Sequence, residues 1–293
     1  MKKLLSITLI LASSVLVLKL ASSHFSLREN EPITESVLSK YSTATLFETE
    51  EEPSSETNSY ESIARVARAI TVKVMAGESW GSGIIFAKQD NTYTVVTNRH
   101  VLIFSPQGDY QIQTPDEQTY QARVLEGVDF GNRDLVLLQF SSELAYEVAH
   151  LNNSSLEMTA LNQEAVFAGG YPMEIESQET AEGFYLNQGN LARLSDRDFG
   201  GGYQIGYTNS VKKGMSGGPL LNSSSQVIGI NGVHKYPLWG NPYQFSDGSV
   251  ATETQKQDMS QFSWAIPINT LLKLAPQFNS QNNFPNLPNP IIQ

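Results

Sequence analysis

A succession of short apolar segments, each bounded by turn residues, constrains the fold of this chain more than any other feature. The segments are rich in Val, Ile, Thr and aromatic residues, which favour β-strands. Their close spacing is typical of an all-β sandwich or of a pair of barrels. In chain order they are AITVKVMAG, SGIIFAK, TYTVVTN, QARVLEG, LVLLQF, EAVFAGGY, YQIGYTN, PLLNSSSQVIGING and FSWAIP.

Helical patterns are sparse. One helix of a turn or two is expected over residues 61–69. A second is expected in INTLLKLA (268–275), where Asn269 can cap the first turn. The expected fold class is therefore all-β, with a short helix near the C-terminal end.

The composition excludes several classes of site. The 293 residues carry a formal net charge of -11, which argues against a nucleic-acid partner because phosphate contacts need clustered Lys and Arg. The absence of cysteine excludes disulfides, thiolate nucleophiles and Cys-based zinc sites. With only four histidines and no HExxH pattern, neither a metal site nor a cofactor is expected.

The first 23 residues are typical of a signal peptide. A basic start precedes an apolar stretch over 4–18, and small residues lead to an expected cleavage site near Ser23. An uncleaved membrane anchor is the alternative, although the run is shorter than the roughly 20 residues of a spanning helix and is followed by Lys19. The protein is thus expected to be secreted or periplasmic, with membrane contact only through this segment if it is uncleaved.

The rest of the chain divides by composition. Residues 24–62 are polar and acidic, lack the apolar residues that would repay ordering entropy, and are interpreted as a mobile spacer or a pro-segment. Residues 276–293 form a tail rich in Pro and Asn. The expected folded domain lies between them, over 63–275.

Three short stretches carry residues that suggest catalytic chemistry. Ser216 lies between glycines in KKGMSGGPLL, His100 follows a strand pattern in YTVVTNRHVL, and Asp134 precedes one in GNRDLVLLQF. Each residue alone is better explained as a turn or strand-end residue. Together they offer a hydroxyl, an imidazole that can take its proton, and a carboxylate that can orient the imidazole.

In this order, TNRHVL, RDLVLLQF and GMSGGPLL resemble the chymotrypsin-like serine protease family, and in particular its cysteine-free bacterial branch, which includes the HtrA-type proteases. SQVIGING and WAIPINTLLKL are similar to the strand after the nucleophile and to the closing strand and helix of that branch. The resemblance covers roughly residues 64–275. It implies two antiparallel six-stranded β-barrels with the site in the cleft between them.

The resemblance also implies a role for each site residue. Ser216 would be the nucleophile, His100 the general base and then acid, and Asp134 its orienting carboxylate. The backbone amides of Gly214 and Ser216 would form the oxyanion hole. The implied function is an exported serine endopeptidase that cleaves polypeptide substrates through an acyl-enzyme intermediate, without cofactor or metal.

The sequence leaves one alternative function class open and excludes another. A protease-fold binding protein with a blocked cleft and no turnover is the alternative hypothesis. An esterase of the α/β-hydrolase type would need the order Ser, Asp, His and a helix after the serine. The order here is His, Asp, Ser, and no helical pattern follows Ser216, which excludes that type.

The expected substrate pocket follows from the same resemblance. Ser210, six residues before Ser216, corresponds to the pocket floor, and a serine there gives no preference for Lys or Arg. The pocket wall is expected near Asn231 and Val233, and the neighbouring His234 leaves an acidic preference open. Met215 stands where trypsin-like members carry the aspartate that pairs with a new N-terminus, so zymogen activation of that kind is not expected.

Overall fold

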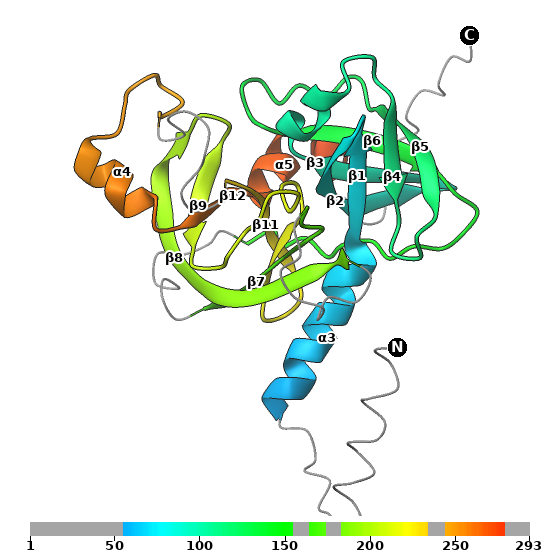
Figure 1. Ribbon diagram of the computed structural model, residues 1–293, viewed down its shortest axis with the longest axis horizontal. Coiled ribbons are helices and arrows are strands. Elements are labelled where there is room, and N and C mark those ends of the chain that lie inside the picture. The colour runs from blue at the N-terminus through cyan, green and yellow to red at the C-terminus, as the bar shows by residue number, and fades with distance from the viewer. Residues whose placement is uncertain (1–54, 155–163, 174–182, 234–243, 279–293) are drawn as a thin grey trace, which may run out of the picture. The chain divides into compact units, whose positions relative to one another are not determined.

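The computed structural model describes residues 55–154, 164–173, 183–233 and 244–278 (Figure 1). The chain divides into two units, Met1–Glu52 and Pro53–Gln293, and every described residue belongs to the second. The expected signal peptide, most of the acidic segment and most of the C-terminal tail lie outside the described residues, as does His234.

The first half of the described chain forms a closed antiparallel barrel in the strand order β1-β2-β3-β6-β5-β4. Its interior is apolar, because alternate residues of each strand point inward, as Val72 and Val74 do on β1. The strands are β1 (Thr71–Ala76), β2 (Ser79–Gln89), β3 (Thr92–Thr97), β4 (Tyr110–Gln113), β5 (Thr119–Val124) and β6 (Val136–Ser141).

The second half repeats this arrangement. Its strands close in the order β10-β11-β12-β9-β8-β7. Read in the opposite direction, this is the order of the first barrel with each strand number raised by six. The strands are β7 (Ala165–Gly170), β8 (Tyr185–Phe199), β9 (Tyr203–Tyr207), β10 (Pro219–Asn222), β11 (Val227–Val233) and β12 (Ser263–Pro267). The expected all-β class with two antiparallel six-stranded barrels is therefore confirmed.

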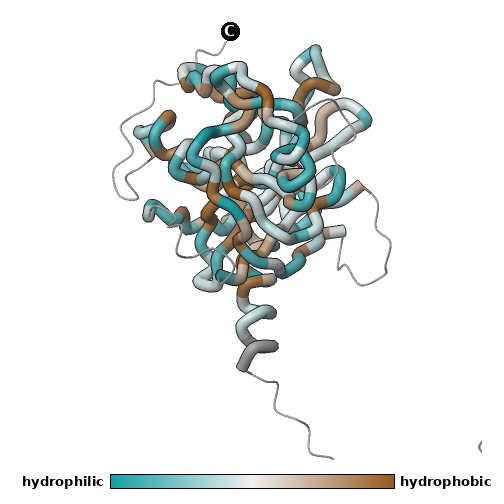
Figure 2. The backbone as a smooth tube through the Cα atoms, turned by 90° about the vertical axis from the view of Figure 1, so that its left-hand side faces the viewer, coloured by the Kyte–Doolittle hydropathy of each residue, from teal (hydrophilic) through white to brown (hydrophobic). Residues whose placement is uncertain are grey.

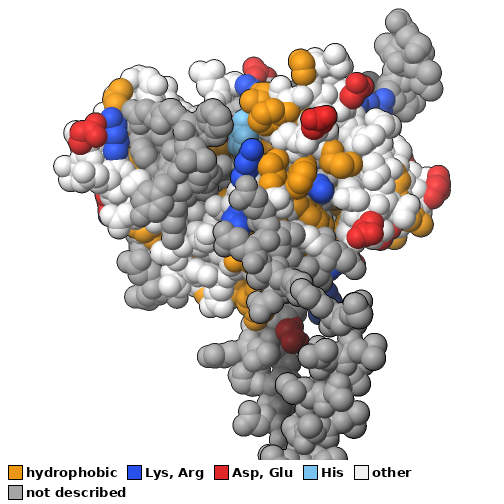
Figure 3. Space-filling model, viewed as in Figure 1, with side chains coloured by type: hydrophobic (Ala, Val, Ile, Leu, Met, Phe, Trp, Pro, Cys, Tyr) orange, Lys and Arg blue, Asp and Glu red, His pale blue; other side chains and the backbone are white. Residues whose placement is uncertain are grey.

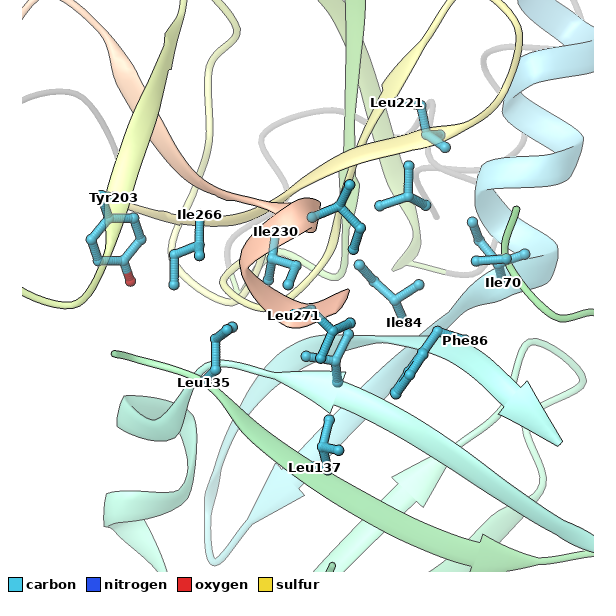
Figure 4. Close-up of a cluster of buried hydrophobic side chains, with 14 of the residues drawn as sticks. Ile70, Ile84, Phe86, Leu135, Leu137, Tyr203, Leu221, Ile230, Ile266 and Leu271 are labelled. Carbon is cyan, nitrogen blue, oxygen red and sulfur yellow. The ribbon is translucent and has the colours of Figure 1, made fainter. Parts of the chain in front are cut away.

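A shared hydrophobic cluster joins the barrels (Figure 4). Leu137 of β6 and Ile230 of β11 lie on either side of Leu271, which belongs to the short helix α5 (Ile268–Leu274). The expected C-terminal helix is thus present, but the expected capping role of Asn269 is wrong. The helix begins directly after Pro267, which leaves Asn269 inside its first turn, and the Asn269 amide donates instead to the Ser154 carbonyl at 3.2 Å.

Helix α3 (Ser55–Ile70) precedes the first barrel and is longer than the expected turn or two. Its inner face carries Ile63, Ala67 and Ile70, which are buried at spacings of four and three residues. Tyr60 anchors the helix to the second barrel, because its hydroxyl donates to the Leu186 carbonyl at 3.0 Å. The helix therefore contacts both barrels, and it begins before the boundary expected at residue 63.

The remaining elements are short helices: η1 (Arg99–Phe104), α4 (Glu253–Met259) and η4 (Pro276–Phe278). Phe278, which belongs to the expected tail, is buried and packs edge-on against Phe86 with ring centroids 5.0 Å apart. None of the helices in the described ranges combines the length and apolarity needed to cross a membrane. Figure 2 shows hydrophobic segments mainly toward the middle of the described backbone, with hydrophilic residues frequent in its outer turns.

Candidate active site

The pairing of β3 with β6 brings His100 and Asp134 together. These strands are antiparallel neighbours, and Thr97 at the end of β3 lies opposite Val136 at the start of β6. His100 follows Thr97 by three residues in η1, and Asp134 precedes Val136 by two. Both side chains therefore emerge at the same end of the same strand pair.

The two residues are joined by two hydrogen bonds. The Asp134 Oδ2 atom lies 2.5 Å from His100 Nδ1, and Oδ1 accepts the backbone N–H of His100 at 2.9 Å. In the tautomer with its proton on Nδ1, the imidazole donates to Asp134 and has a lone pair on Nε2 that can accept a proton. The His100 side chain is 42% exposed, whereas that of Asp134 is 16% exposed, so the ring faces outward from a largely covered carboxylate.

Ser216 is held in a tight turn between β9 and β10 that only glycine permits. Gly214 and Gly217 have φ angles of +95° and +87°. A Cβ atom at Gly217 would lie 2.1 Å from the Ser82 carbonyl oxygen, and one at Gly214 would lie 2.5 Å from that of Tyr171. The turn is fixed from outside as well, because the Ser82 N–H donates to the Ser216 carbonyl at 2.7 Å.

Two backbone amides of this turn are available as donors. The Lys213 carbonyl accepts the Met173 N–H at 2.8 Å. In a planar trans peptide the C=O and the next N–H point in opposite directions, so the Gly214 N–H points away from Met173. Within the described parts of the chain, neither the Gly214 nor the Ser216 N–H has an acceptor.

A chain of contacts connects the serine to the histidine pair. The Ser216 hydroxyl donates to the Gly232 carbonyl at 3.2 Å rather than to His100. A Cβ atom built on Gly81 would touch both the Ser216 carbonyl oxygen (3.1 Å) and the side chain of Val101 (2.5 Å). The serine turn and the histidine segment therefore lie against the same point of β2. A hydrogen bond between a serine hydroxyl and a histidine often tightens only when substrate binds.

Comparison with known proteins identifies the fold and the family of this chain. Residues 81–230, just over half of the chain, match the family described as "Trypsin-like peptidase domain". The chain belongs to this family. The match includes all three segments around His100, Asp134 and Ser216, and it confirms the resemblance seen in the sequence.

Relatives of this trypsin-like peptidase domain include named proteases. Serine protease Do-like HtrA of Bacillus subtilis is 30% identical over 161 residues, covering 52% of this chain and 33% of that protein. Serine protease Do-like HtrA of Lactobacillus helveticus is 31% identical over 160 residues, covering 53% and 36%. The chain thus spans about a third of the length of these curated relatives.

The structure of the serine endoprotease from Yersinia pestis is similar in fold, with a TM-score of 0.52 and 20% identity. The similarity covers 75% of this chain and 66% of that one. It agrees with the pair of closed barrels found here.

The trypsin-like peptidase domain contains a site residue that the sequence did not reveal. The Tyr203 hydroxyl donates to Asp134 Oδ2 at 2.5 Å. Burial, together with the neighbouring Asp134 charge, raises the pKa of Tyr203 well above its usual value, so the phenol stays protonated and remains a donor. A contact between residues 69 positions apart has no local signal, although the glycine run in FGGGY is consistent with a close approach of the backbone.

The expected pocket residues lie in different environments. Ser210 is exposed, and Val233 is half-buried at the end of β11. Asn231 is fully buried, and its side chain does not line a pocket: Oδ1 accepts the Tyr207 hydroxyl at 2.8 Å, and Nδ2 donates to the carbonyls of Gly169 and Pro219 at 3.1 and 3.0 Å. Its polar atoms are used inside the second barrel, so the expectation of a pocket-wall side chain at this position is corrected.

The face of the molecule shown in Figure 3 is mixed in character, with hydrophobic, basic and acidic side chains interspersed over it. Over the described ranges, no group of three or more His, Asp or Glu side chains is placed to hold a metal ion. A hollow of about 370 Å³ lies on the second barrel beside Gln204 and Asn269, and its lining includes none of His100, Asp134, Tyr203 and Ser216.

Proposed function

We propose that this domain is a serine endopeptidase in which Ser216, His100 and Asp134 act as the catalytic triad. The observation that carries the proposal is the pair formed by Asp134 and His100, whose Oδ2 and Nδ1 atoms lie 2.5 Å apart, beside a glycine-bounded serine turn. Two backbone amides of this turn, those of Gly214 and Ser216, have no acceptor among the described residues. The named proteases among the relatives support the same reaction class.

Each group has a defined task in the proposed reaction. The Ser216 hydroxyl attacks the scissile carbonyl carbon while His100 Nε2 takes its proton, and Asp134 stabilises the imidazolium that forms. The amides of Gly214 and Ser216 donate to the oxyanion. His100 then protonates the leaving amine, which departs and leaves an acyl-enzyme. Water activated by the same imidazole hydrolyses this ester and restores the serine.

The proposal extends to substrates and to cellular location. The substrates are polypeptides, and Ser210 and the backbone around Val233 are proposed to border the pocket for the residue before the cut. No cofactor or metal is required for this reaction. Export is proposed from the signal-like pattern of residues 1–23.

Labelling with a fluorophosphonate tests the proposal, because the reagent phosphonylates only a serine that is activated by a base and an oxyanion site. We expect one adduct on the full-length chain by intact mass, and none on Ser216→Ala. The matched control is Ser223→Ala, which removes an exposed hydroxyl in the β10–β11 turn and should leave the adduct in place.

An unfolded protein such as casein provides the second readout. Internal cleavage by the parent and not by Ser216→Ala would identify an endopeptidase. Absence of both adduct and cleavage in the folded parent would contradict the proposal. That outcome would favour the alternative, a binding protein that keeps the protease fold and in which the Ser216 hydroxyl stays bonded to Gly232.

A further inference from the structure

We propose that Tyr203 is a positioning residue of this site: its hydroxyl, supplied by the second barrel, holds the Asp134 carboxylate of the first barrel and thereby fixes His100. The inference rests on the proposed function, because it assigns to Tyr203 a part in the chemistry of Ser216 and His100.

The hydroxyl and the imidazole share one carboxylate oxygen. Asp134 Oδ2 lies 2.5 Å from the Tyr203 hydroxyl and 2.5 Å from His100 Nδ1. Tyr203 is 5% exposed, so water does not compete freely for this oxygen. Figure 4 shows the Tyr203 hydroxyl pointing from the second barrel toward the segment of Leu135, the residue next to Asp134.

Two glycines make the space that the phenol occupies. A Cβ atom on Gly232 would lie 2.2 Å from the Tyr203 hydroxyl oxygen, and one on Gly201 would lie 2.8 Å from the ring carbon Cε2. Gly201 also accepts the backbone N–H of Asp134 at 2.9 Å, and Gly232 accepts the hydroxyl of Ser216. The phenol therefore lies between the segments that carry the acid and the nucleophile.

The other buried tyrosines in the described ranges have no hydrogen bond to Asp134. Tyr93, at the opposite end of β3 from His100, donates to the Leu144 carbonyl at 2.9 Å and accepts the Tyr146 N–H at 3.1 Å. Its ring is fully buried, as the ring of Tyr203 nearly is. Tyr93→Phe therefore removes a comparable hydroxyl without touching the site, and it is the matched control.

Removal of the Tyr203 hydroxyl should change both the rate and the pH profile. Asp134 would keep His100 as its remaining side-chain donor, and its less neutralised charge would favour the protonated imidazole more strongly. A protonated imidazole cannot take the serine proton, so the acidic limb of the activity profile should move to higher pH. The plateau rate should fall by about ten- to a hundredfold, which is the usual contribution of one hydrogen bond to a charged group.

The experiment measures the second-order rate constant of fluorophosphonate labelling of the full-length chain between about pH 5 and pH 9, the range in which histidine titrates. The parent, Tyr203→Phe and Tyr93→Phe are compared. We expect a lower plateau and a shifted acidic limb for Tyr203→Phe, and a profile that coincides with the parent for Tyr93→Phe.

A folded Tyr203→Phe protein with an unshifted limb would overturn the inference. If that variant does not fold, Gly232→Ala replaces it, because the added methyl group would displace the phenol from Asp134; an unshifted limb there has the same meaning. A parent that takes no label overturns the proposed function and this inference with it, whereas a labelled parent with coincident profiles overturns the inference alone.

Discussion

The two barrels have the same strand order, but they hold their site residues in different ways. The first barrel presents His100 and Asp134 on segments next to paired strands, and hydrogen bonds between side chains orient them. The second barrel presents Ser216 through its backbone, in a turn with positive φ angles at Gly214 and Gly217. We therefore expect that substitutions at His100 or Asp134 can remove activity without loss of the fold. Substitutions around the serine turn should affect activity and the fold together.

Buried polar side chains occur in both barrels, but the two cores differ in what lies near the strand ends. Near Ser216 the second barrel buries the Asn231 amide, whose hydrogen bonds join β11 to β7, β9 and β10. The first barrel instead places an aromatic cluster of Tyr93, Tyr120, Phe140 and Tyr146 in and beside its core. Burial of a polar group is costly unless the group is paired, and three hydrogen bonds pair the Asn231 amide.

The largest effect is expected for Asp134→Asn. This variant tests whether the activity proposed for His100 and Asp134 can be lost while the fold is kept. The amide can donate to His100 Nδ1, which leaves the proton on Nε2 and removes the base. We expect kcat to fall by about 10⁴ with little change in the thermal transition.

Asp129→Asn is the control for this variant, because Asp129 is a nearby exposed acid that accepts the Gly131 N–H at 2.7 Å and has no bond to His100. Peptide-cleavage rates and thermal melts of both variants make the comparison. A parental rate in Asp134→Asn would show that Asp134 has no role in orienting the base.

In the second barrel, Asn231→Ala should reduce stability and activity together. The change leaves the Tyr207 hydroxyl and the carbonyls of Gly169 and Pro219 without the Asn231 partner, at a cost of about 3 kcal/mol in the free energy of unfolding. Urea denaturation measures this loss. The control is Asn91→Ala, at an exposed position of the first barrel, which should cost less than about 0.5 kcal/mol. Equal losses in the two variants would contradict the role given to the buried Asn231 amide in holding the second barrel.

A smaller effect is expected for Ser82→Ala, which tests whether a residue of the first barrel helps to hold the serine turn of the second. Ser82 belongs to β2 of the first barrel, yet its hydroxyl donates to the Gly214 carbonyl and accepts the Tyr171 N–H, both at 2.8 Å. Loss of these bonds loosens the serine turn, and we expect the fluorophosphonate rate to fall about tenfold.

The control for Ser82→Ala is Ser142→Ala, a buried first-barrel serine whose hydroxyl donates to Tyr120 and accepts the Leu144 N–H. This variant should be less stable but should label at the parental rate. If Ser82→Ala also labels at the parental rate, the serine turn is held by the second barrel alone.

The sequence predicted the architecture well because the necessary signals are local. Short β-branched runs mark the strands, and the segments around His100, Asp134 and Ser216 carry the family pattern. The contact of Tyr203 with Asp134 was missed because it depends on the placement of β9 and on space left by Gly201 and Gly232.

Two further differences have physical causes of the same kind. The polar start of α3 lacks a helical pattern of apolar residues, so the helix was expected to be shorter. Asn231 was assigned to a pocket wall from its position in the family pattern. Its burial depends on Tyr207 and on two carbonyls of neighbouring strands, which no local pattern shows.

The hydrogen bond from Tyr203 to Asp134 and that from Ser82 to Ser216 both cross from one barrel to the other. A nascent chain acquires neither bond until its second barrel has been synthesised and has docked on the first. If the proposed site depends on them, a half-made molecule lacks Ser216 as well as both bonds, and a partly unfolded molecule carries all three side chains but cannot cleave its neighbours. The division of the site between two barrels would then delay proteolysis until biosynthesis is complete.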